Sequence, residues 1–438
     1  PVIATVKHYA CNNSEYDRHK SNSIVDERTL REIYLPAFKR CVECGTLAVM
    51  TSYNQINGTY ASEHPYLLDG ILRGEWCFEH LVVSDWNSLY STDGVLSCGV
   101  DLEMPGPRYL SKEKVLDALR RNVVDEDAVD TKVLHLFRAY EKAGLFSSPL
   151  SDQSFHAGCK EHREVALEVA QSSVVLLKNE QLLPLKKGAS ICLGGGNADK
   201  VAQGGGSSMI HLPEDQVTLA KKLGDQATLL PTYWYRSRTY MNTVMHADVV
   251  ILVVGFDHVL ESEAYDRPWK LEKQDIQSIK HATALNKNTV VIVQSGGAVE
   301  MSSWHSSVKA ILWTSYLGSS TAEALESIVF GTCNPCGKLP FTWAHKLSDY
   351  RSMRVYPKDF QLLNLDRLRK GQGDPAVREV SPLSYTEGLM VGYRQFDTEQ
   401  LEMLYCFGHG LSYSDFSYED LTLVKKGEQL FELSCTEI

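Results

Sequence analysis

The sequence predicts an α/β protein of 438 residues, with consecutive βα units first, a layered α/β segment next and a short β segment last. Three observations lead to this fold class. Short apolar runs alternate with longer amphipathic stretches in residues 1–146. Polar and reactive side chains directly follow those early runs. From residue 161 onward the apolar runs are continuous, which is typical of parallel strands covered by helices on both faces.

Residues 1–146 contain four predicted βα units. The strands are Val2–Val6, Thr46–Thr51, Leu81–Ser84 and Gly99–Glu103. The helix-like stretches are Asp26–Glu43, Ser62–Glu75, Ser88–Ser97, Ser111–Asn122 and Asp125–Ala143. Reactive side chains at the carboxyl ends of parallel strands are typical of a (β/α)₈ TIM barrel. Four strands would leave two edges unpaired, so we expect the second half of such a barrel. Its first half would precede Pro1 in the same polypeptide or come from a separate chain.

Residues 147–160 form a predicted linker, and residues 161–413 a predicted αβα sandwich. The sandwich strands are Ser190–Leu193, Ala227–Leu230, Asp248–Gly255, Thr289–Gln294 and Ala310–Thr314. The helices are His162–Ser173, Tyr235–His246, Lys273–Asn286 and Thr321–Phe330. The stretch His345–Asp397 is charged, and we expect an irregular excursion there. Residues 414–438 alternate polar and apolar side chains, which indicates the start of an incomplete β domain.

The composition excludes several classes of protein. Hydrophobic residues make up 43% of the chain, together with 13 Phe, 21 Tyr and 7 Trp, which is incompatible with a disordered chain. The longest apolar run, Val249–Phe256, is much shorter than the roughly 18 residues of a transmembrane helix. A diffuse net charge of −11 argues against nucleic acid or an anionic membrane as partner. We therefore expect a soluble chain.

Two glycine-rich segments and two cysteine pairs raise the question of a cofactor or a metal. Gly194–Gly196 follows a strand, but Asp199 occupies the last position of a dinucleotide fingerprint, and Gly204–Gly206 lacks the Lys-Ser/Thr of a phosphate loop. These glycines are better explained by close backbone approach. The pairs Cys41/Cys44 and Cys333/Cys336 are too far apart in the chain to make a shared zinc site a good explanation. We expect no cofactor and no metal.

Asp85 is the sharpest candidate for chemistry. It ends the apolar strand Leu81–Ser84 and is followed by Trp86. A carboxylate at the exit of a barrel strand can act as nucleophile, general base or metal ligand, and an indole suits the apolar face of a sugar ring. The alternative is that Asp85 caps the following helix, with Ser84 or Asn87 competing for that task.

A second candidate is the loop Glu261–Arg267, which follows a strand of the sandwich. It carries Glu261, Glu263 and Asp266, and the Arg beside them could help to tune the pKa of an acid. The alternative is a solvated charged loop. Lys7 and His8, at the end of the first strand, are either hydrogen-bond donors to hydroxyl groups or an ordinary polar loop.

These residues and their surroundings resemble glycoside hydrolase family 3, in its β-glucosidase branch. The match in the first segment comprises Lys7-His8, Asn12-Asn13, Glu15-x-x-Arg18, Thr29-Leu30-Arg31-Glu32, Ser52-Tyr53-Asn54, Ser84-Asp85-Trp86 and Gly99 to Gly106. The match in the second comprises Leu177-Lys178-Asn179-Glu180, Leu183-Pro184-Leu185, Asn334-Pro335, Gly337-Lys338-Leu339-Pro340 and Phe407 to Tyr413. The motifs are colinear over nearly the whole chain.

The resemblance implies a retaining double displacement, in which Asp85 is the nucleophile. It implies that a Glu on a sandwich loop is the acid/base, and we expect Glu263 in this role, with Glu261 as the reserve. Retention requires the two carboxyl groups to be about 5–5.5 Å apart.

The resemblance also implies a sugar pocket. Lys7 and His8 would donate to hydroxyls, Met50 and Tyr53 would lie near the ring, and Trp86 would form a wall. Ser207 is a further candidate. An Asp and an Arg of the pocket would come from the first half of the barrel, and a fibronectin-III-like domain would follow this chain.

Two departures from the family pattern are Asn87, where Gly is usual, and Cys336, where Ser is usual. The substrate expected is a β-glucoside or oligosaccharide, cleaved at its terminal non-reducing β-D-glucosyl residue. The alternatives are a β-xylosidase or other β-glycosidase of the same family, or a truncated, inactive sugar-binding remnant.

Overall fold

The computed structural model describes residues 2–15, 18–147, 158–213, 215–263, 266–356, 381–428 and 430–437. The chain forms two compact units. The first unit comprises Pro1–Ala157, Glu261–Pro268 and Lys346–Glu402, and the second comprises Gly158–Leu260, Trp269–His345 and Met403–Ile438. The carboxylate-bearing loop 261–268 thus belongs to the same unit as the N-terminal βα repeats. Most of the predicted linker 147–160 lies outside the described residues.

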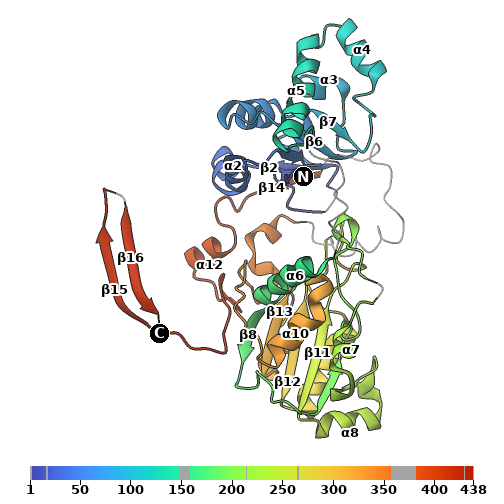
Figure 1. Ribbon diagram of the computed structural model, residues 1–438, viewed down its shortest axis with the longest axis vertical. Helices are drawn as coiled ribbons and strands as arrows, with labels where there is room; N and C mark the ends of the chain where they lie inside the picture. The colour runs from blue at the N-terminus through green and yellow to red at the C-terminus, as the bar shows by residue number, and fades with distance from the viewer. Residues whose placement is uncertain are drawn as a thin grey trace. The chain divides into compact units, whose positions relative to one another are not determined.

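The first unit is built on a four-stranded parallel sheet in the order β1-β3-β6-β7 (Figure 1). The strands are β1 Thr5–Tyr9, β3 Ala48–Thr51, β6 Leu81–Trp86 and β7 Leu102–Met104. Within this sheet the strands are paired in their order along the chain. The predicted α/β class is confirmed. The expected bounds of β1 were wrong. Because the strand begins at Thr5, Lys7 and His8 lie within it.

The helices of the first unit are shorter and more interrupted than the sequence predicts. They are α1 Glu27–Thr29, α2 Pro36–Glu43, α3 Thr92–Leu96, α4 Lys112–Arg120, α5 Glu126–Lys142 and α12 Tyr393–Glu399, with π-helical segments at Leu30–Tyr34 and Tyr66–Glu75. Short 3₁₀ turns lie at Ala61–Glu63, Leu347–Asp349 and Arg351–Arg354. The single helix expected over Asp26–Glu43 is divided. Proline has no N–H to continue a helix, and α2 accordingly starts at Pro36.

The two faces of this sheet carry alternate residues of each strand, as the period of two requires. Val49 and Val82 pack in a core with Tyr66–Glu75, whose Leu67, Leu68, Ile71 and Leu72 are all buried. Ala48, Leu81 and Val83 face the other side, where they meet Ala139 of α5. Both faces of the strand that bears Asp85 are therefore covered by apolar side chains.

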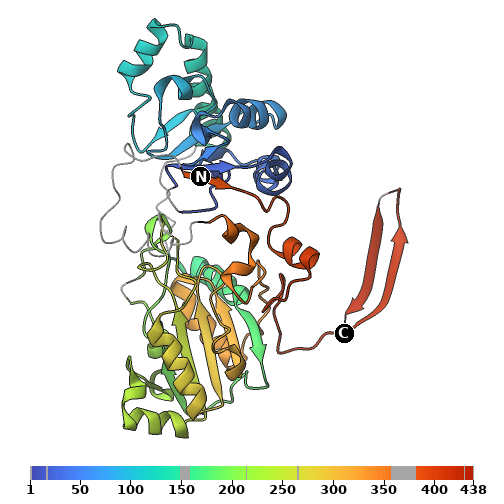
Figure 2. The same cartoon turned by 180° about the vertical axis from the view of Figure 1, so that it is seen from behind.

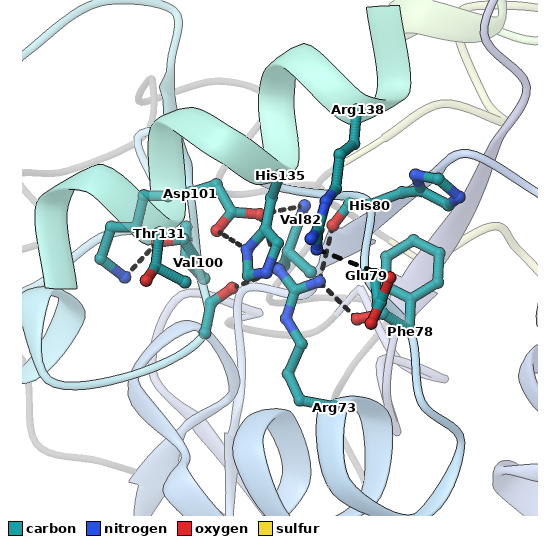
Figure 3. A network of polar contacts seen from close by, with 12 residues as sticks. Arg73, Phe78, Glu79, His80, Val82, Val100, Asp101, Thr131, His135 and Arg138 are labelled. Atoms are coloured by element: carbon teal, nitrogen blue, oxygen red, sulfur yellow. Dashed lines mark hydrogen bonds and ion pairs between the residues drawn. The ribbon is translucent and has the colours of Figure 1, made fainter. Parts of the chain in front are cut away.

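A polar network at the amino end of β6 and β7 joins these strands to α5 (Figure 3). Asp101, which immediately precedes β7, accepts hydrogen bonds through Oδ2 from the backbone N–H of Val82 at 2.7 Å and from Arg73 Nη2 at 2.7 Å. Its Oδ1 lies 2.9 Å from Nδ1 of His135 on α5. The carboxylate of Asp101 thus fixes the relative register of three elements.

A second, small sheet in the first unit has the order β14-β2-β4-β5. Its strands are β2 Ser21–Ile24, β4 Gln55–Ile56, β5 Thr59–Tyr60 and β14 Ser381–Ser384. β14 pairs in parallel with β2. The expectation that His345–Asp397 is irregular was wrong in two places, at β14 and at α12, where Phe396 is fully buried. Residues 357–380 of this stretch lie outside the described residues.

The second unit contains a six-stranded sheet in the order β10-β9-β11-β12-β13-β8 (Figures 1 and 2). The strands are β8 Val175–Asn179, β9 Ile191–Gly194, β10 Ala227–Leu229, β11 Val249–Gly255, β12 Thr289–Gln294 and β13 Ala310–Thr314. All pairs are parallel except β8 with β13, which is antiparallel. The sequence prediction missed β8, because only Val174 separates this strand from the preceding helix.

Helices cover both faces of this sheet. They are α6 Lys160–Ser173, α7 Leu219–Leu223, α8 Arg238–His246, α9 Lys273–Leu285 and α10 Thr321–Val329. One core includes buried residues of α8 and α9, and the other includes buried residues of α6, α7 and α10. Further 3₁₀ turns lie at Gly206–Ser208, Gly224–Gln226, Trp234–Arg236, His305–Ser307 and Gly318–Ser320. The layers are those of an αβα sandwich.

The chain ends in an antiparallel hairpin of β15 Tyr418–Lys425 and β16 Phe431–Glu437. Large apolar side chains such as Leu421 and Leu433 are exposed on it. In the described part of the chain, no helix has the length and apolarity needed to cross a membrane.

Candidate active site

Asp85 is the penultimate residue of β6 and is buried. Its backbone carbonyl accepts hydrogen bonds from the N–H and the hydroxyl of Ser88, which close a tight turn after the strand. Within this turn Asn87 has a φ of 58°, a left-handed conformation that Asn tolerates better than most residues. This explains why Asn can stand where the family resemblance implies Gly.

The alternative role of Asp85 as a helix cap was wrong. The next helix, α3, begins only at Thr92, and its N-cap is Ser91, whose hydroxyl accepts the N–H of Gly94 at 3.0 Å. The Asp85 carboxylate is therefore not used to satisfy a helix terminus.

Three groups contact the Asp85 carboxylate. The Tyr53 hydroxyl donates to Oδ1 at 2.9 Å, and the backbone N–H of Trp86 donates to the same oxygen at 2.7 Å. Nε2 of His8 lies 3.2 Å from Oδ2. His8 comes from β1 and Tyr53 follows β3, so the carboxyl ends of three adjacent strands converge on this carboxylate, as the prediction from parallel strands requires.

The two side-chain partners of Asp85 are uncharged at neutral pH. Burial lowers the pKa of His8, against the opposing pull of the Asp85 carboxylate. Burial and the Asp85 carboxylate together raise the pKa of Tyr53, so the phenol keeps its proton and remains a donor. Asp85 thus lies among neutral hydrogen-bond partners rather than in a pair with a fixed cation.

The residues on either side of Tyr53 hold the loop that follows β1. The Ser52 hydroxyl donates to the carbonyl of Ala10 at 3.0 Å, and Asn54 Nδ2 donates to the carbonyls of Ala10 at 3.3 Å and Cys11 at 3.2 Å. The polar motif after β3 therefore has two tasks. Its outer residues fix the neighbouring loop, and its central tyrosine reaches Asp85.

Glu263 joins the same cluster through Arg18. Arg18 Nη2 lies 3.2 Å from Oε2 of Glu263, and Nη1 lies 3.0 Å from Oε2 of Glu15. The guanidinium carbon lies 4.3 Å from the centroid of the Tyr53 ring. The Glu263 carboxylate, like the larger influence of Asp85, acts to raise the pKa of both His8 and Tyr53, although burial lowers the pKa of His8 overall. Glu263 and Asp85 therefore act on the same two side chains.

Glu261 has a different environment from Glu263. Its Oε1 lies 3.4 Å from Nε of Arg267, so it forms an ion pair within its own loop. The side chain of Glu261 is 19% exposed, whereas that of Glu263 is 36% exposed. Of the two candidate carboxylates, Glu263 is the one that contacts Arg18 and is the more accessible.

The other predicted site residues are distributed as follows. Lys7 is exposed on β1 beside His8, and Trp86, at the end of β6, is 47% exposed. Met50 is half-buried in β3 and packs in the core that contains Val83. Ser207 lies in a helical turn of the second unit. The structure thus brings His8, Tyr53, Asp85 and Glu263 together within the first unit, and Ser207 belongs to the other unit.

Sequence reasoning did not select Arg18 and Glu15 as site residues. The signal was present in the spacing Glu15-x-x-Arg18, which the structure uses as an ion pair. The loop that carries Glu261, Glu263 and Asp266 has one arginine of its own, and Arg18 supplies a second cation beside Glu263.

The glycine-rich segment Gly194–Gly196 and the two cysteine pairs can now be placed in the structure. Gly195 has a φ of 96°, and a Cβ there would lie 2.2 Å from the carbonyl oxygen of Val253, so the glycine permits close packing against β11. Cys41 and Cys44 lie in the first unit, and Cys333 and Cys336 in the second. Within the described ranges, no group of three or more His, Cys, Asp or Glu residues could hold a metal ion.

Comparison with protein-family models gives two matches. Residues 1–139 match the glycosyl hydrolase family 3 N terminal domain, and residues 174–393 match the glycosyl hydrolase family 3 C-terminal domain. The chain belongs to glycoside hydrolase family 3. The resemblance inferred from the motifs is confirmed.

Individual family 3 proteins are similar over nearly all of this chain. Thermostable beta-glucosidase B of Acetivibrio thermocellus is 34% identical over 97% of the chain and 55% of its own length. An exo-alpha-(1->6)-L-arabinopyranosidase of Bifidobacterium longum is 29% identical over 99% of the chain and 57% of its own length. The chain thus spans a little over half the length of these curated relatives.

Solved structures of family members have the same fold. Beta-glucosidase 3B from Thermotoga neapolitana matches with a TM-score of 0.86 and 28% identity, over 99% of this chain and 65% of that one. A GH3 beta-glucosidase from Bifidobacterium adolescentis matches with a TM-score of 0.86 and 30% identity, over 100% of this chain and 63% of that one.

Proposed function

We propose that this family 3 chain carries the nucleophile and the acid/base of a retaining, exo-acting β-glucosidase. The substrate would be a β-glucoside or oligosaccharide, cleaved at its terminal non-reducing β-D-glucosyl residue. The observation that carries the proposal is the Asp85 carboxylate, buried at the end of β6 among neutral donors from adjacent strands. The names of the relatives, several of them β-glucosidases, support the choice of glycone.

In the first step Asp85 would attack the anomeric carbon and form a glycosyl-enzyme intermediate. Its two oxygens differ in availability. Oδ1 accepts hydrogen bonds from both Tyr53 and Trp86, whereas the contact of Oδ2 among the described residues is His8 at 3.2 Å. We therefore assign the attack to Oδ2, with the bonds to Oδ1 holding the carboxylate in orientation.

Glu263 would act first as the acid, protonating the leaving oxygen, and then as the base that activates water for hydrolysis of the intermediate. Its contact with Arg18, which packs on the Tyr53 ring, supports this choice over Glu261, whose partner is in its own loop. The mechanism requires the Glu263 and Asp85 carboxyl groups to be about 5–5.5 Å apart with substrate bound.

The remaining predicted residues would bind the glycone. Lys7 and His8 would donate to its hydroxyls, Met50 and Tyr53 would lie near the ring, and the half-exposed indole of Trp86 would form a wall. Ser207 stays a further candidate for binding the glycone. We further propose that the four-stranded sheet is half of a (β/α)₈ barrel and that the final hairpin begins a fibronectin-III-like domain.

The direct test replaces Asp85 with Asn in the full-length protein and measures hydrolysis of an aryl β-glucoside. We expect kcat to fall by at least about 10³-fold, because no nucleophile remains. The matched control is Asp117→Asn, an exposed aspartate on α4, which should retain activity. Unchanged activity of the Asp85 variant would contradict the proposal.

Hydrolysis of a panel of aryl glycosides decides which sugar the enzyme removes. The name of one relative is a reason to add a third glycoside to this panel. Because the Bifidobacterium longum protein is named for arabinopyranoside, the panel includes α-L-arabinopyranoside besides β-glucoside and β-xyloside. The proposal predicts the highest kcat/KM for the β-glucoside. Faster hydrolysis of either other glycoside would reassign the glycone, and no hydrolysis by the wild type would favour a sugar-binding remnant.

A further inference from the structure

A second polar junction lies beside the loop that carries Glu263. The Tyr356 hydroxyl donates to Oδ2 of Asp266 at 2.6 Å, and the backbone N–H of Glu15 donates to Oδ1 of Asp266 at 3.3 Å. The hydroxyls of Ser14 and Tyr356 are also hydrogen-bonded to each other. Three segments that are far apart in the sequence thus meet at one carboxylate, and all three belong to the first unit.

This junction is linked to the candidate acid/base through Glu15. The backbone of Glu15 binds Asp266, while its side chain binds Arg18, which in turn binds Glu263. The loop is therefore attached to residues 14–18 at two points three residues apart. A displacement at Asp266 would be transmitted to Glu263 through Glu15 and Arg18.

We propose that Tyr356 is a positioning residue, which acts through Asp266 to place the Glu263 carboxylate relative to Asp85. Tyr356 is not among the partners of the Asp85 carboxylate, so its contribution is indirect. The inference rests on the proposed role of Glu263. Its physical basis is that the side chain of Glu263 is 36% exposed on a loop, and a misplacement of about 1 Å can cost a catalytic group about 10²-fold in rate.

The test is Tyr356→Phe in the full-length protein, which removes the hydroxyl and keeps the ring. Two substrates are compared: cellobiose, whose sugar leaving group needs a proton, and 2,4-dinitrophenyl β-glucoside, whose leaving group does not. We expect kcat/KM for cellobiose to fall about tenfold and kcat/KM for the dinitrophenyl glucoside to stay within about twofold. Asp266→Asn should give the same pattern, because Asn keeps only one acceptor oxygen for two donors. When that oxygen accepts the Glu15 N–H, an NH₂ group that cannot accept a proton faces the Tyr356 hydroxyl.

The control is Tyr140→Phe, the same chemical change on α5, which should affect neither substrate. Equal losses on both substrates, or no loss on cellobiose, would overturn the role of Tyr356. Glu263→Gln separates this result from failure of the proposed function. If Glu263→Gln shows the leaving-group dependence and Tyr356→Phe does not, only the present inference fails. If Glu263→Gln shows none, the acid/base assignment fails and this inference with it.

Discussion

Two buried aspartates at opposite ends of neighbouring strands have contrasting environments. Asp101 precedes β7, its side chain is 1% exposed, and it pairs with the guanidinium of Arg73 at 2.7 Å (Figure 3). Asp85 lies at the carboxyl end of β6, its side chain is 10% exposed, and its side-chain partners are a phenol and a neutral imidazole. The same residue type in the same sheet is thus neutralised at one end and left reactive at the other.

The network around Asp101 extends through its cation. Arg73 Nη1 donates to the carbonyls of Phe78 at 2.7 Å and His80 at 2.6 Å, and Nη2 donates to the carbonyl of Gly99 at 3.1 Å. These bonds tie the chain before β6 to the chain before β7. Buried charges that are paired and hydrogen-bonded are typical of structural sites, and in barrel proteins the amino end of the parallel strands contributes stability.

The comparison separates two uses of a buried carboxylate. Where both oxygens bind donors that include a cation, the group contributes to stability. Where one oxygen has a longer contact, 3.2 Å to a neutral imidazole, and the side chain is partly exposed, the group is available to a substrate. Substitution of Asp101 should therefore lower mainly stability, and substitution of Asp85 should lower mainly activity.

The largest expected effect is on stability, from Asp101→Asn. Removing this charge leaves Arg73 buried without its counter-ion, which should lower the free energy of unfolding by about 3–5 kcal/mol. Asp85→Asn should change that free energy by less than about 1 kcal/mol while abolishing turnover. Urea unfolding and active-site-normalised kcat measure both quantities. A folded Asp101→Asn enzyme with strongly reduced kcat at unchanged stability would break the comparison.

A third buried aspartate, Asp275 on α9, extends the comparison to the second unit. Its Oδ1 accepts the N–H of Gly196 at 3.0 Å, and burial raises its pKa to about 6. The unfolded chain ionises this group near pH 4, so the folded state holds more protons between about pH 4 and 6. Its contribution to stability is therefore present at pH 4 and is lost as the pH rises through about 6.

Asp275→Asn should remove this pH dependence. The difference in unfolding free energy between variant and wild type should shift in favour of the variant by about 2–3 kcal/mol from pH 4 to pH 7. Denaturant unfolding at four pH values within this range measures it. Parallel curves for the two proteins would contradict the assignment of the raised pKa.

The sequence predicted the strands and site residues whose signal lies in residues that are adjacent in the chain. Apolar runs predicted the strand that ends at Asp85 and most strands of the sandwich. Asp85 itself was selected because barrel enzymes carry their reactive side chains at the carboxyl ends of parallel strands. The sequence did not predict the edge strand β8, the pairing of β14 with β2 or the contact of Arg18 with Glu263. Each depends on contacts between segments distant in the sequence, such as residues 18 and 263.

The smallest effect is expected from Tyr53→Phe, which removes one donor from Oδ1 of Asp85 while the ring remains beside Arg18. A hydrogen bond to a charged group contributes about 1.5–3 kcal/mol, and the Trp86 N–H still orients the carboxylate. We expect kcat to fall about tenfold and the free energy of unfolding to fall by about 1.5 kcal/mol. A loss as large as that of Asp85→Asn would mean that Tyr53 does more than orient the carboxylate.

The most direct test of the central claim, that Asp85 is the nucleophile, is to trap the intermediate. The full-length protein is incubated with an activated 2-deoxy-2-fluoro-β-glucoside, digested and mapped by mass spectrometry. The account predicts one fluoroglucosyl label, on the peptide that contains Asp85 and absent from the Asp85→Asn variant. A label on any other carboxylate, Glu263 included, would contradict it.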